Sequence, residues 1–419
     1  MKIGLSTSVI QRGETGVAQY VFALLRGLLA RNDGHRFTIF ALQDDLPLFD
    51  FARGHCTIIE VPERFRLPLK DIFWHQTVLP KLARRHRLHV LHIPSYRRMV
   101  WSRPCTLVAT IHDLAPFRVP KKYDWKRMFY GKVVARRLAR RQDRIIAVSQ
   151  NTANDIANFF HVSTERMATI YNGLDHGRFF PGTRTHAKEF VSLRYDLKQP
   201  FFLYIARLEH PGKNHVRLIE AFNRFKTETK SNWQLVLGGS DWHGADVIHA
   251  MIRQSPYRNE IRCVGFVADS ELPAFYRAAE AFVYPSLYEG FGFPPIEAMA
   301  CACPALCSSR GSLAEVAGEA ATLDPENIFD LAQQLKRLAT DQEFREHLRA
   351  TGLKRAQTFD WQRTAAETVK LYALAHGQAA QTLQSVPKGQ PAIAQGFNLG
   401  IQPRMNIGPE GTAEIIKTR

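Results

Sequence analysis

The stretch Ser286-Leu-Tyr-Glu-Gly-Phe-Gly-Phe-Pro-Pro-Ile-Glu-Ala-Met-Ala300 decides how the chain folds and where its chemistry lies. It follows an apolar run, residues 281–284, that we expect to form a strand. Its two glycines would weaken a strand or a helix, so we expect a loop over residues 289–293. The two prolines that follow suit a first helical turn. This order of strand, loop and helix offers free amides and a positive helix end to an anion, with two carboxylates, Glu289 and Glu297, in the same pocket.

Short apolar runs alternate with amphipathic stretches along most of the chain. In the first half we expect strands at residues 2–8, 37–42, 56–61, 90–93, 106–111 and 144–148, with helices at 16–31, 72–85 and 124–141 between them. In the second half we expect strands at 201–205, 234–237, 262–266, 281–284 and 304–307, with helices at 213–225, 269–278 and 294–300. The pattern predicts an α/β fold of two tandem Rossmann-like parallel-sheet domains that face each other across a cleft.

A length of 419 residues fits two or three domains. We predict an N-terminal domain over residues 1–185 and a C-terminal domain over residues 186–376 that includes the final helix. Residues 181–199 are polar with little apolar periodicity, which indicates a linker. From residue 377 to residue 419, Gln, Gly, Pro and Ala dominate, and we expect a mobile tail.

The charge is concentrated in the first half of the chain. The formal net charge is +17, and residues 1–190 hold 31 Lys and Arg against 15 Asp and Glu, a net of +16. The densest stretch, residues 118–144, has eleven basic residues. A field of this sign attracts nucleic acid, an anionic membrane surface or a phosphate-bearing substrate. For any single arginine, a solvated helix face is the simpler interpretation.

Composition excludes several classes of protein. Hydrophobic residues make up 45% of the chain, which is enough to form cores and excludes disorder throughout. The chain has no apolar run of the ~20 residues that a membrane span needs, and its start is too polar for a secretion signal, so we expect a cytoplasmic protein. The six cysteines are too few for a disulfide scaffold at this length. Three of them, Cys301, Cys303 and Cys307, lack the spacing of a zinc site and are expected in the core.

The fifteen-residue stretch resembles the E-x7-E signature of the retaining glycosyltransferases of family 4, which have the GT-B fold. Other segments resemble that family in the same order. They are the glycine loop 13–20, Ile111-His112-Asp113-Leu114, Ala147-Val-Ser149, Tyr171-Asn172-Gly173-Leu174-Asp175, Tyr204-Ile-Ala-Arg207 with Lys213-Asn214, and Val264-Gly265-Phe266-Val267. The resemblance covers residues 1 to about 375.

The resemblance implies a role for each matching residue. Arg207 and Lys213 would stabilise the charge that grows on the departing diphosphate, and Glu289 would lie by the donor sugar. His112 would bind the donor sugar or orient the acceptor, although a strand-end histidine bonded to backbone is the simpler interpretation. For Arg207 and Lys213 the alternative is a surface ion pair with Glu209. The other residues with implied roles are Gly16, Val267, Phe291, Gly292, Phe293 and Glu297 for the donor, and Asp113, Tyr96 and Arg97 for the acceptor.

The family's chemistry is metal-independent retention, so the resemblance implies no metal and no cofactor. The expected donor is a GDP-sugar or UDP-sugar, with a lean toward mannose. From the basic half we expect a saccharide or polyprenyl-linked acceptor and contact with an anionic membrane surface on the cytoplasmic face. The product is expected to be a cell-surface polysaccharide or glycan.

Two other functions compete with this interpretation. A GT-B nucleotide-sugar epimerase would use the donor without an acceptor, and the spacing of Glu289 and Glu297 disfavours it. A basic nucleic-acid-binding protein is also conceivable, but the chain lacks recognised binding modules and interleaved stacking aromatics, so we expect no nucleic acid.

Overall fold

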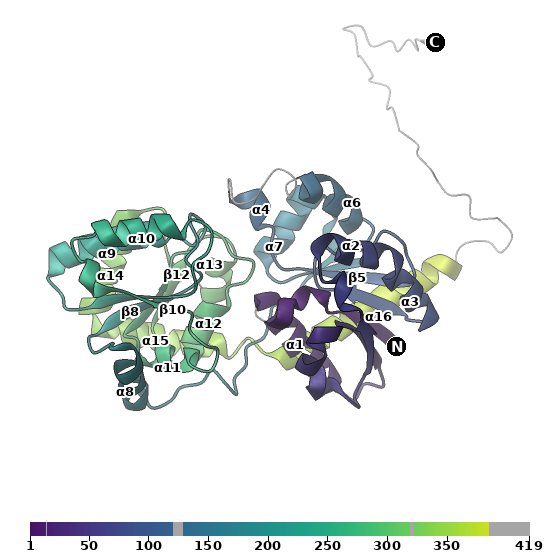
Figure 1. Cartoon of the computed structure of the whole chain (residues 1–419), viewed down its shortest axis with the longest axis horizontal. Coiled ribbons are helices and arrows are strands. Elements are labelled where there is room, and N and C mark those ends of the chain that lie inside the picture. The colour runs from purple at the N-terminus through teal and green to yellow at the C-terminus, as the bar shows by residue number, and fades with distance from the viewer. Residues whose placement is uncertain (14, 120–128, 319–321, 385–419) are drawn as a thin grey trace, which may run out of the picture. The chain divides into compact units, whose positions relative to one another are not determined.

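A computed structural model describes residues 1–13, 15–119, 129–318 and 322–384 of the chain. Residues Met1–Ala379 form one compact unit that contains two parallel sheets. We call the part built on the first sheet the first lobe and the part built on the second sheet the second lobe (Figure 1). The predicted two-domain α/β architecture is therefore confirmed. No helix among the described residues is both long enough and apolar enough to cross a bilayer.

The first sheet has seven described strands in the order β3-β2-β1-β4-β5-β6-β7. Their bounds are β1 (Lys2–Ser6), β2 (Arg36–Leu42), β3 (Thr57–Val61), β4 (Val90–Ile93), β5 (Thr106–Ile111), β6 (Arg144–Ala147) and β7 (Met167–Thr169). The helices of this lobe are α1 (Gly16–Leu29), α2 (Pro68–Thr77), α3 (Leu79–Arg85), α4 (Ala115–Arg118), α6 (Arg136–Ala139) and α7 (Gln150–Asp155). Shorter helical segments are η1 (Ser8–Gly13), η2 (Gln43–Ala52), η3 (Glu63–Phe65), η4 (Tyr130–Ala135), η5 (Ile156–Phe160) and η6 (Thr164–Arg166).

The second sheet has six described strands in the order β10-β9-β8-β11-β12-β13. Their bounds are β8 (Phe201–Ile205), β9 (Gln234–Gly238), β10 (Ile261–Gly265), β11 (Ala281–Tyr284), β12 (Ala305–Ser308) and β13 (Thr322–Leu323). The helical segments are α8 (Arg184–Tyr195), α9 (His215–Thr229), α10 (Ala245–Gln254), η7 (Arg258–Glu260), α11 (Leu272–Ala278), α12 (Phe293–Ala300), α13 (Ser312–Ala317), α14 (Ile328–Thr340), α15 (Gln342–Ala356) and α16 (Trp361–Gln384).

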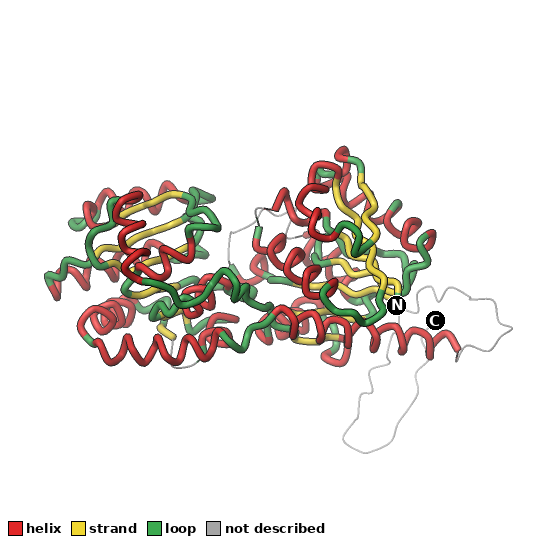
Figure 2. Tube along the Cα trace, turned by 90° about the horizontal axis from the view of Figure 1, so that it is seen from below, coloured by secondary structure: helices red, strands yellow, loops and turns green. Residues whose placement is uncertain are grey.

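Alternate strand residues enter cores on the two faces of the first sheet, as the period of two requires. Ile39 of β2 packs in the core that contains α1, while its neighbour Phe40 packs in the core that contains Trp74 of α2. Figure 2 shows helices on both faces of each sheet, which is why strands such as β5 are buried along their whole length. The three cysteines expected in the core, Cys301, Cys303 and Cys307, are buried.

The final helix departs from the predicted domain assignment. We expected it within the domain of residues 186–376, but Ala365, Leu371, Tyr372 and Ala375 of α16 belong to a core of the first lobe. A Cβ on Gly27 of α1 would lie 3.0 Å from Cβ of Ala365, so the two helices pack closely. The helix also runs to Gln384, past the expected start of a tail at residue 377. The remaining tail, residues 385–419, lies outside the described residues.

Two helix predictions need correction. The expected linker at residues 181–199 contains α8, which buries only Ala187 and Val191 and therefore has little apolar periodicity. The single helix expected at residues 72–85 is two helices, because Pro80 has no N–H to continue the hydrogen bonding of α2 and instead lies in the first turn of α3. Of the basic stretch 118–144, residues 120–128 lie outside the described part of the chain.

Candidate active site

Both sheets reverse their strand order at one point, and several of the predicted site residues follow the strands beside those points. In the first sheet the order reverses between β1 and β4, and in the second between β8 and β11. Ligands of open parallel sheets bind outside the carboxyl ends of the strands at such a reversal. Arg207 and Lys213 follow β8, and Glu289 follows β11, so the fold brings them to one edge.

Lys213 and Glu289 form an ion pair across the reversal of the second sheet. Lys213 Nζ lies 2.6 Å from Glu289 Oε1, and the Tyr284 hydroxyl donates to the same oxygen at 3.0 Å. Burial disfavours the charged carboxylate, but the adjacent Lys213 ammonium holds the pKa of Glu289 below its ordinary value. A mostly buried cation is thus fixed where the strands end, and its ion-pair partner is Glu289, whereas the alternative interpretation had named Glu209.

Arg207 is the more accessible of the two predicted cations. Its side chain is 55% exposed, lies 3.8 Å from the buried carboxylate of Glu209, and stacks over Trp242 with its Cζ 4.7 Å from the ring centre. The ion pair expected as the alternative for this residue is therefore present. It is long, and it leaves the guanidinium accessible to a second anion.

A cavity of about 500 Å³ is lined by Arg207 of the second lobe and by residues of the first lobe. Tyr96, Arg97, His112 and Asp113, all predicted site residues, line it together with Arg207. Arg98, next to the predicted Arg97, also lines it, as do Arg12 and Arg66, which were not predicted. The sequence signal for Arg12 and Arg66 was only the excess of positive charge. Gly16 is not among the lining residues, although Thr15 and Val17 on either side of it are.

His112 is held from two sides. Its Nε2 lies 3.2 Å from the carbonyl oxygen of Pro94, and its ring packs edge-on against Tyr20 with the centres 4.6 Å apart. Burial lowers the pKa of His112 to about 4, so the imidazole is neutral near pH 7. The backbone contact expected for a strand-end histidine is present, and His112 also faces the cavity.

A buried polar chain supports Tyr20 behind His112. The Tyr20 hydroxyl lies 3.0 Å from Thr110 Oγ1, which lies 2.8 Å from Nε2 of His92. The His92 Nδ1 lies 2.6 Å from the hydroxyl of Tyr372 in α16. The final helix therefore contributes a hydrogen bond to the scaffold behind the cavity.

Glu297 has a different partner from Lys213 and Glu289. It accepts a hydrogen bond of 2.8 Å from the Tyr276 hydroxyl of α11. Burial raises the pKa of Glu297 to about 7, only partly opposed by the Tyr276 hydrogen bond and the charge of Arg178. A carboxylate that is costly to ionise in the free protein would gain from donors such as sugar hydroxyls.

The glycines of the loop allow close backbone approach. A Cβ on Gly290 would lie 1.8 Å from the carbonyl oxygen of His112, so the loops that carry Glu289 and His112 touch. Gly292 has φ of 98°, in the left-handed region, and precedes α12. The Phe291 ring is buried against Phe359, so its side chain is not available to a ligand. Val267 is likewise buried in the core of the second lobe.

Contacts between the lobes near this loop had no local signal in the sequence. The Tyr288 hydroxyl donates to Asp155 Oδ2 at 2.7 Å and accepts from the Leu114 amide at 3.2 Å. Ser149 donates to the carbonyl oxygen of Gly290 at 2.8 Å. Glu315 of the second lobe accepts the amides of Gln150 and Asn151 at the start of α7. Each contact joins residues more than a hundred positions apart.

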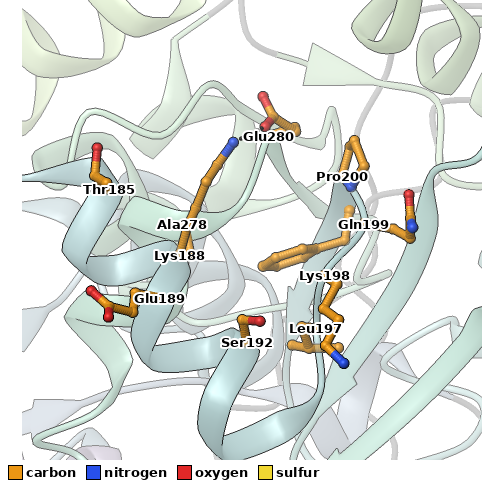
Figure 3. Close-up of a pocket in the computed structure, with 11 residues that line it drawn as sticks. Thr185, Lys188, Glu189, Ser192, Leu197, Lys198, Gln199, Pro200, Ala278 and Glu280 are labelled. Carbon is orange, nitrogen blue, oxygen red and sulfur yellow. Dashed lines mark hydrogen bonds and ion pairs between the residues drawn. The ribbon is translucent and has the colours of Figure 1, made fainter.

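A second cavity, of about 480 Å³, lies beside the amino end of β8 (Figure 3). Lys188 of α8 reaches Glu280 there, with 2.8 Å between Nζ and Oε1. None of the predicted site residues lines it. Because the predicted site residues of the second lobe lie after β8, β10 and β11, this cavity is separate from the candidate site.

Comparison with known proteins agrees with this arrangement. A model described as Glycosyltransferase Family 4 matches residues 15–178, and one described as Glycosyl transferases group 1 matches residues 186–355. Together the matched segments span well over half of the chain. The chain belongs to glycosyltransferase family 4. The prediction of a GT-B glycosyltransferase is thus confirmed, and neither the epimerase nor the nucleic-acid-binding interpretation is favoured.

Relatives of this glycosyltransferase include several mannosyltransferases. The O-antigen chain mannosyltransferase B of Escherichia coli is 28% identical over 385 residues, which is 89% of this chain and all of that protein. The serotype-specific mannosyltransferase WbdA of Escherichia coli is 31% identical over 62% of this chain, but the match spans only 32% of that longer protein.

Solved structures show the shared fold of the glycosyltransferase. Sucrose-phosphate synthase from Thermosynechococcus elongatus superposes with a TM-score of 0.72 at 20% identity, covering 90% of this chain and all of that one. Anabaena Alr3699/HepE in complex with UDP-glucose superposes with a TM-score of 0.66 at 19% identity, covering 92% of this chain and all of that one.

Glu297 allows a test by pH. Its pKa is higher in the folded protein than in the unfolded chain, so the fold loses stability as pH rises from about 4.5 to about 7. We expect Glu297→Gln to raise the melting temperature of the free glycosyltransferase at pH 8, with a gain that shrinks toward pH 5. Differential scanning calorimetry across this range measures it.

Glu280 in the same lobe gives the control of opposite sign. Burial opposes its ionisation, but Lys188 and Arg184 hold the pKa of Glu280 below its ordinary value. Its contribution to stability is therefore present at pH 8 and lost in acid. Glu280→Gln should lower the melting temperature at pH 8. A Glu297→Gln variant that also melts earlier at pH 8 would contradict the burial argument.

Proposed function

We propose that the protein transfers mannose from a nucleotide-diphosphate sugar, with GDP-mannose as the first donor to test, to a saccharide acceptor during cell-surface polysaccharide synthesis. The observation that carries this proposal is the match along the whole length of an O-antigen chain mannosyltransferase. A structural neighbour that holds UDP-glucose supports a nucleotide sugar as the donor class.

In the proposed reaction, Arg207 and Lys213 hold the diphosphate. The bond between the anomeric carbon and a phosphate oxygen breaks, and negative charge grows on the departing diphosphate. Fixed cations stabilise that charge more in the transition state than in the bound donor, which raises turnover. Lys213 needs little reorganisation for this role, because Glu289 already fixes its ammonium group.

We further propose that Glu297 accepts the ribose hydroxyls, that the amides of residues 291–293 contact the donor sugar, and that Gly16 lets the first loop approach the phosphate. Val267 would support the turn that contacts the base. The acceptor would attack from the face that the diphosphate leaves, so the sugar configuration is retained, and the leaving phosphate would take the acceptor proton. His112 and Asp113 would orient the acceptor in the cavity with Tyr96 and Arg97.

The acceptor we propose is a saccharide on a polyprenyl carrier, presented at the cytoplasmic face of a membrane. The cavity supports this choice through its cations, since Arg12, Arg97 and Arg98 line it beside His112 and Asp113. Guanidinium groups favour phosphate-bearing ligands because they donate paired hydrogen bonds.

A donor screen tests the function. GDP-mannose, UDP-glucose and UDP-galactose would each be added to the protein, and the melting temperature measured for each. A ligand that binds only the folded state raises it. The stabilising nucleotide sugar is then supplied with a polyprenyl-linked saccharide acceptor, and the product's anomeric configuration is read by NMR. Stabilisation by no sugar nucleotide, or a product with inverted configuration, would contradict the proposal.

Metal independence gives a separate prediction. If Arg207 and Lys213 supply the positive charge for the diphosphate, no metal ion is needed. Transfer should then continue at an unchanged rate after the protein is treated with excess EDTA and exchanged into metal-free buffer. A glycosyltransferase that binds its donor through Mn²⁺ or Mg²⁺ serves as the positive control for chelation. Loss of transfer in EDTA that added Mg²⁺ restores would show that the cations are insufficient.

A further inference from the structure

Exposed apolar side chains gather along α2 of the first lobe. The side chains of Leu67, Leu69 and Phe73 are 59%, 81% and 60% exposed. Leu69 and Phe73 are four residues apart on the helix, so they project from the same face. Large apolar groups that gather on a surface usually mark an interaction site, whereas scattered ones do not.

Trp101 extends this surface. Its side chain is 52% exposed, and its amide donates to Gln76 Oε1 of α2 at 2.9 Å. Gln76 also donates to the carbonyl oxygen of Met99 at 2.9 Å, which fixes the segment before Trp101 against the helix. Gln76 lies one turn beyond Phe73. We call Leu67, Leu69, Phe73 and Trp101 the apolar strip.

Basic groups border the apolar strip. Lys70 is exposed between Leu69 and Asp71, and Arg64 is exposed three residues before Leu67. Arg141 stacks on Trp101, with its Cζ 4.6 Å from the ring centre. Asp71, the carboxylate nearest to Lys70 in sequence, is buried and paired with Arg98. Glu63, beside Arg64 in the sequence, is paired with Arg66, so Arg64, Lys70 and Arg141 give the border a positive charge.

The apolar strip adjoins the cavity assigned to the acceptor. Arg66 and Pro68, which flank Leu67 in the sequence, both line that cavity, as do Asp71 and Arg98. The start of α2 thus has one side on the cavity and another on the apolar strip. A partner that covers the strip would lie next to this cavity.

We propose that the apolar strip docks on an anionic lipid bilayer and brings the acceptor cavity to the membrane surface. Tryptophan and leucine flanked by arginine and lysine suit the boundary between headgroups and acyl chains. Each basic residue near an anionic leaflet adds attraction. A second copy of the chain is a poorer occupant, because an isologous contact would place two positive borders together. The orientation toward a lipid-borne acceptor rests on the proposed function, whereas bilayer binding does not.

Vesicle sedimentation of the full chain tests the docking surface. The probes are vesicles of phosphatidylglycerol with phosphatidylethanolamine, and vesicles of phosphatidylcholine alone. We expect the protein to bind the first kind, and the double variant Leu69→Asp/Phe73→Asp to bind it at least ~10-fold more weakly, since two apolar groups no longer enter the interface and two negative charges face the lipid.

Leu193→Asp is the matched control. Leu193 lies on α8 of the second lobe and is 81% exposed, the same as Leu69, but has no part in the strip. It should bind vesicles as the unaltered chain does. Equal binding by the double variant, or equal binding to phosphatidylcholine alone, would overturn the proposal.

Two further readouts separate the remaining outcomes. Sedimentation velocity without lipid shows whether the strip binds a second copy of the chain. If the unaltered chain and Leu193→Asp were dimers, the double variant were a monomer, and vesicle binding were unchanged, bilayer docking would be overturned. Transfer to a soluble acceptor analogue checks the proposed function, and we expect the double variant to retain it. Absence of transfer by every variant would contradict the proposed function and leave the vesicle result standing.

Discussion

Arg207→Ala is expected to lower kcat by roughly 10²–10³-fold while the affinity for the nucleotide sugar changes much less. In the proposed reaction the guanidinium binds the diphosphate of the donor, and its contribution grows as the leaving group gains charge. Its attachments in the free protein are weak, since Glu209 is 3.8 Å away. Initial rates at saturating donor and acceptor measure kcat, and calorimetric titration measures donor binding.

Arg224 provides a closely matched control for this variant. It is 48% exposed, pairs with Glu228, and stacks over Phe329 at 4.6 Å, much as Arg207 stacks over Trp242. It lies on α9, away from the carboxyl ends of the strands. Arg224→Ala should keep kcat. If Arg207→Ala also kept it, the guanidinium would have no role in turnover.

Gly290→Ala is expected to lower kcat/KM by about 10²-fold or more, through misplacement of the site and not through loss of a functional group. The added Cβ would lie 1.8 Å from the carbonyl oxygen of His112 and 2.9 Å from the Cβ of Asp113. One of the two loops must move, because Glu289 lies in the loop of Gly290 and His112 lies in the loop that the added Cβ would strike. A larger distance between Glu289 and His112 would place the donor and the acceptor less precisely for the reaction. Steady-state kinetics measure the loss.

The fold should survive this change, because the collision is between two loops and not within a core. The melting temperature of Gly290→Ala is therefore expected to fall only modestly. Gly377→Ala is the control: Gly377 lies in α16 with no atom within 4 Å of the added Cβ, so activity should be unchanged. Full activity in Gly290→Ala would show that the contact with His112 is not needed during turnover.

The local parts of the site could be predicted from the sequence. The run from β11 through the glycine loop to α12 has the expected order, because prolines, glycines and apolar spacing act over a few residues. The pairing of Lys213 with Glu289 was not foreseen. Their positions in sequence do not reveal that β8 and β11 are neighbours, and Glu209, the partner considered as the alternative, lies much closer along the chain.

Contacts between distant segments were not predictable for the same reason. Tyr288 has no pattern that indicates a bond to Asp155, since the two are 133 positions apart. The helix α8 was missed because it buries a narrow face, and narrow faces give weak periodicity. Arg12 and Arg66 reach the cavity from separate segments of the chain, so the sequence indicated only that positive charge was abundant.

The position of α16 has a consequence for biosynthesis of the chain. Most residues of the first lobe leave the ribosome before Trp361 is made, yet Ala365, Leu371 and Tyr372 complete the core against α1. Until they arrive, the growing polypeptide carries an open apolar groove, and the Nδ1 of His92 lacks its Tyr372 partner. The first lobe, although it is translated first, can therefore complete its core only after the second lobe has been made. A ribosome that stalls before Trp361 would leave this core exposed to aggregation or to chaperone binding.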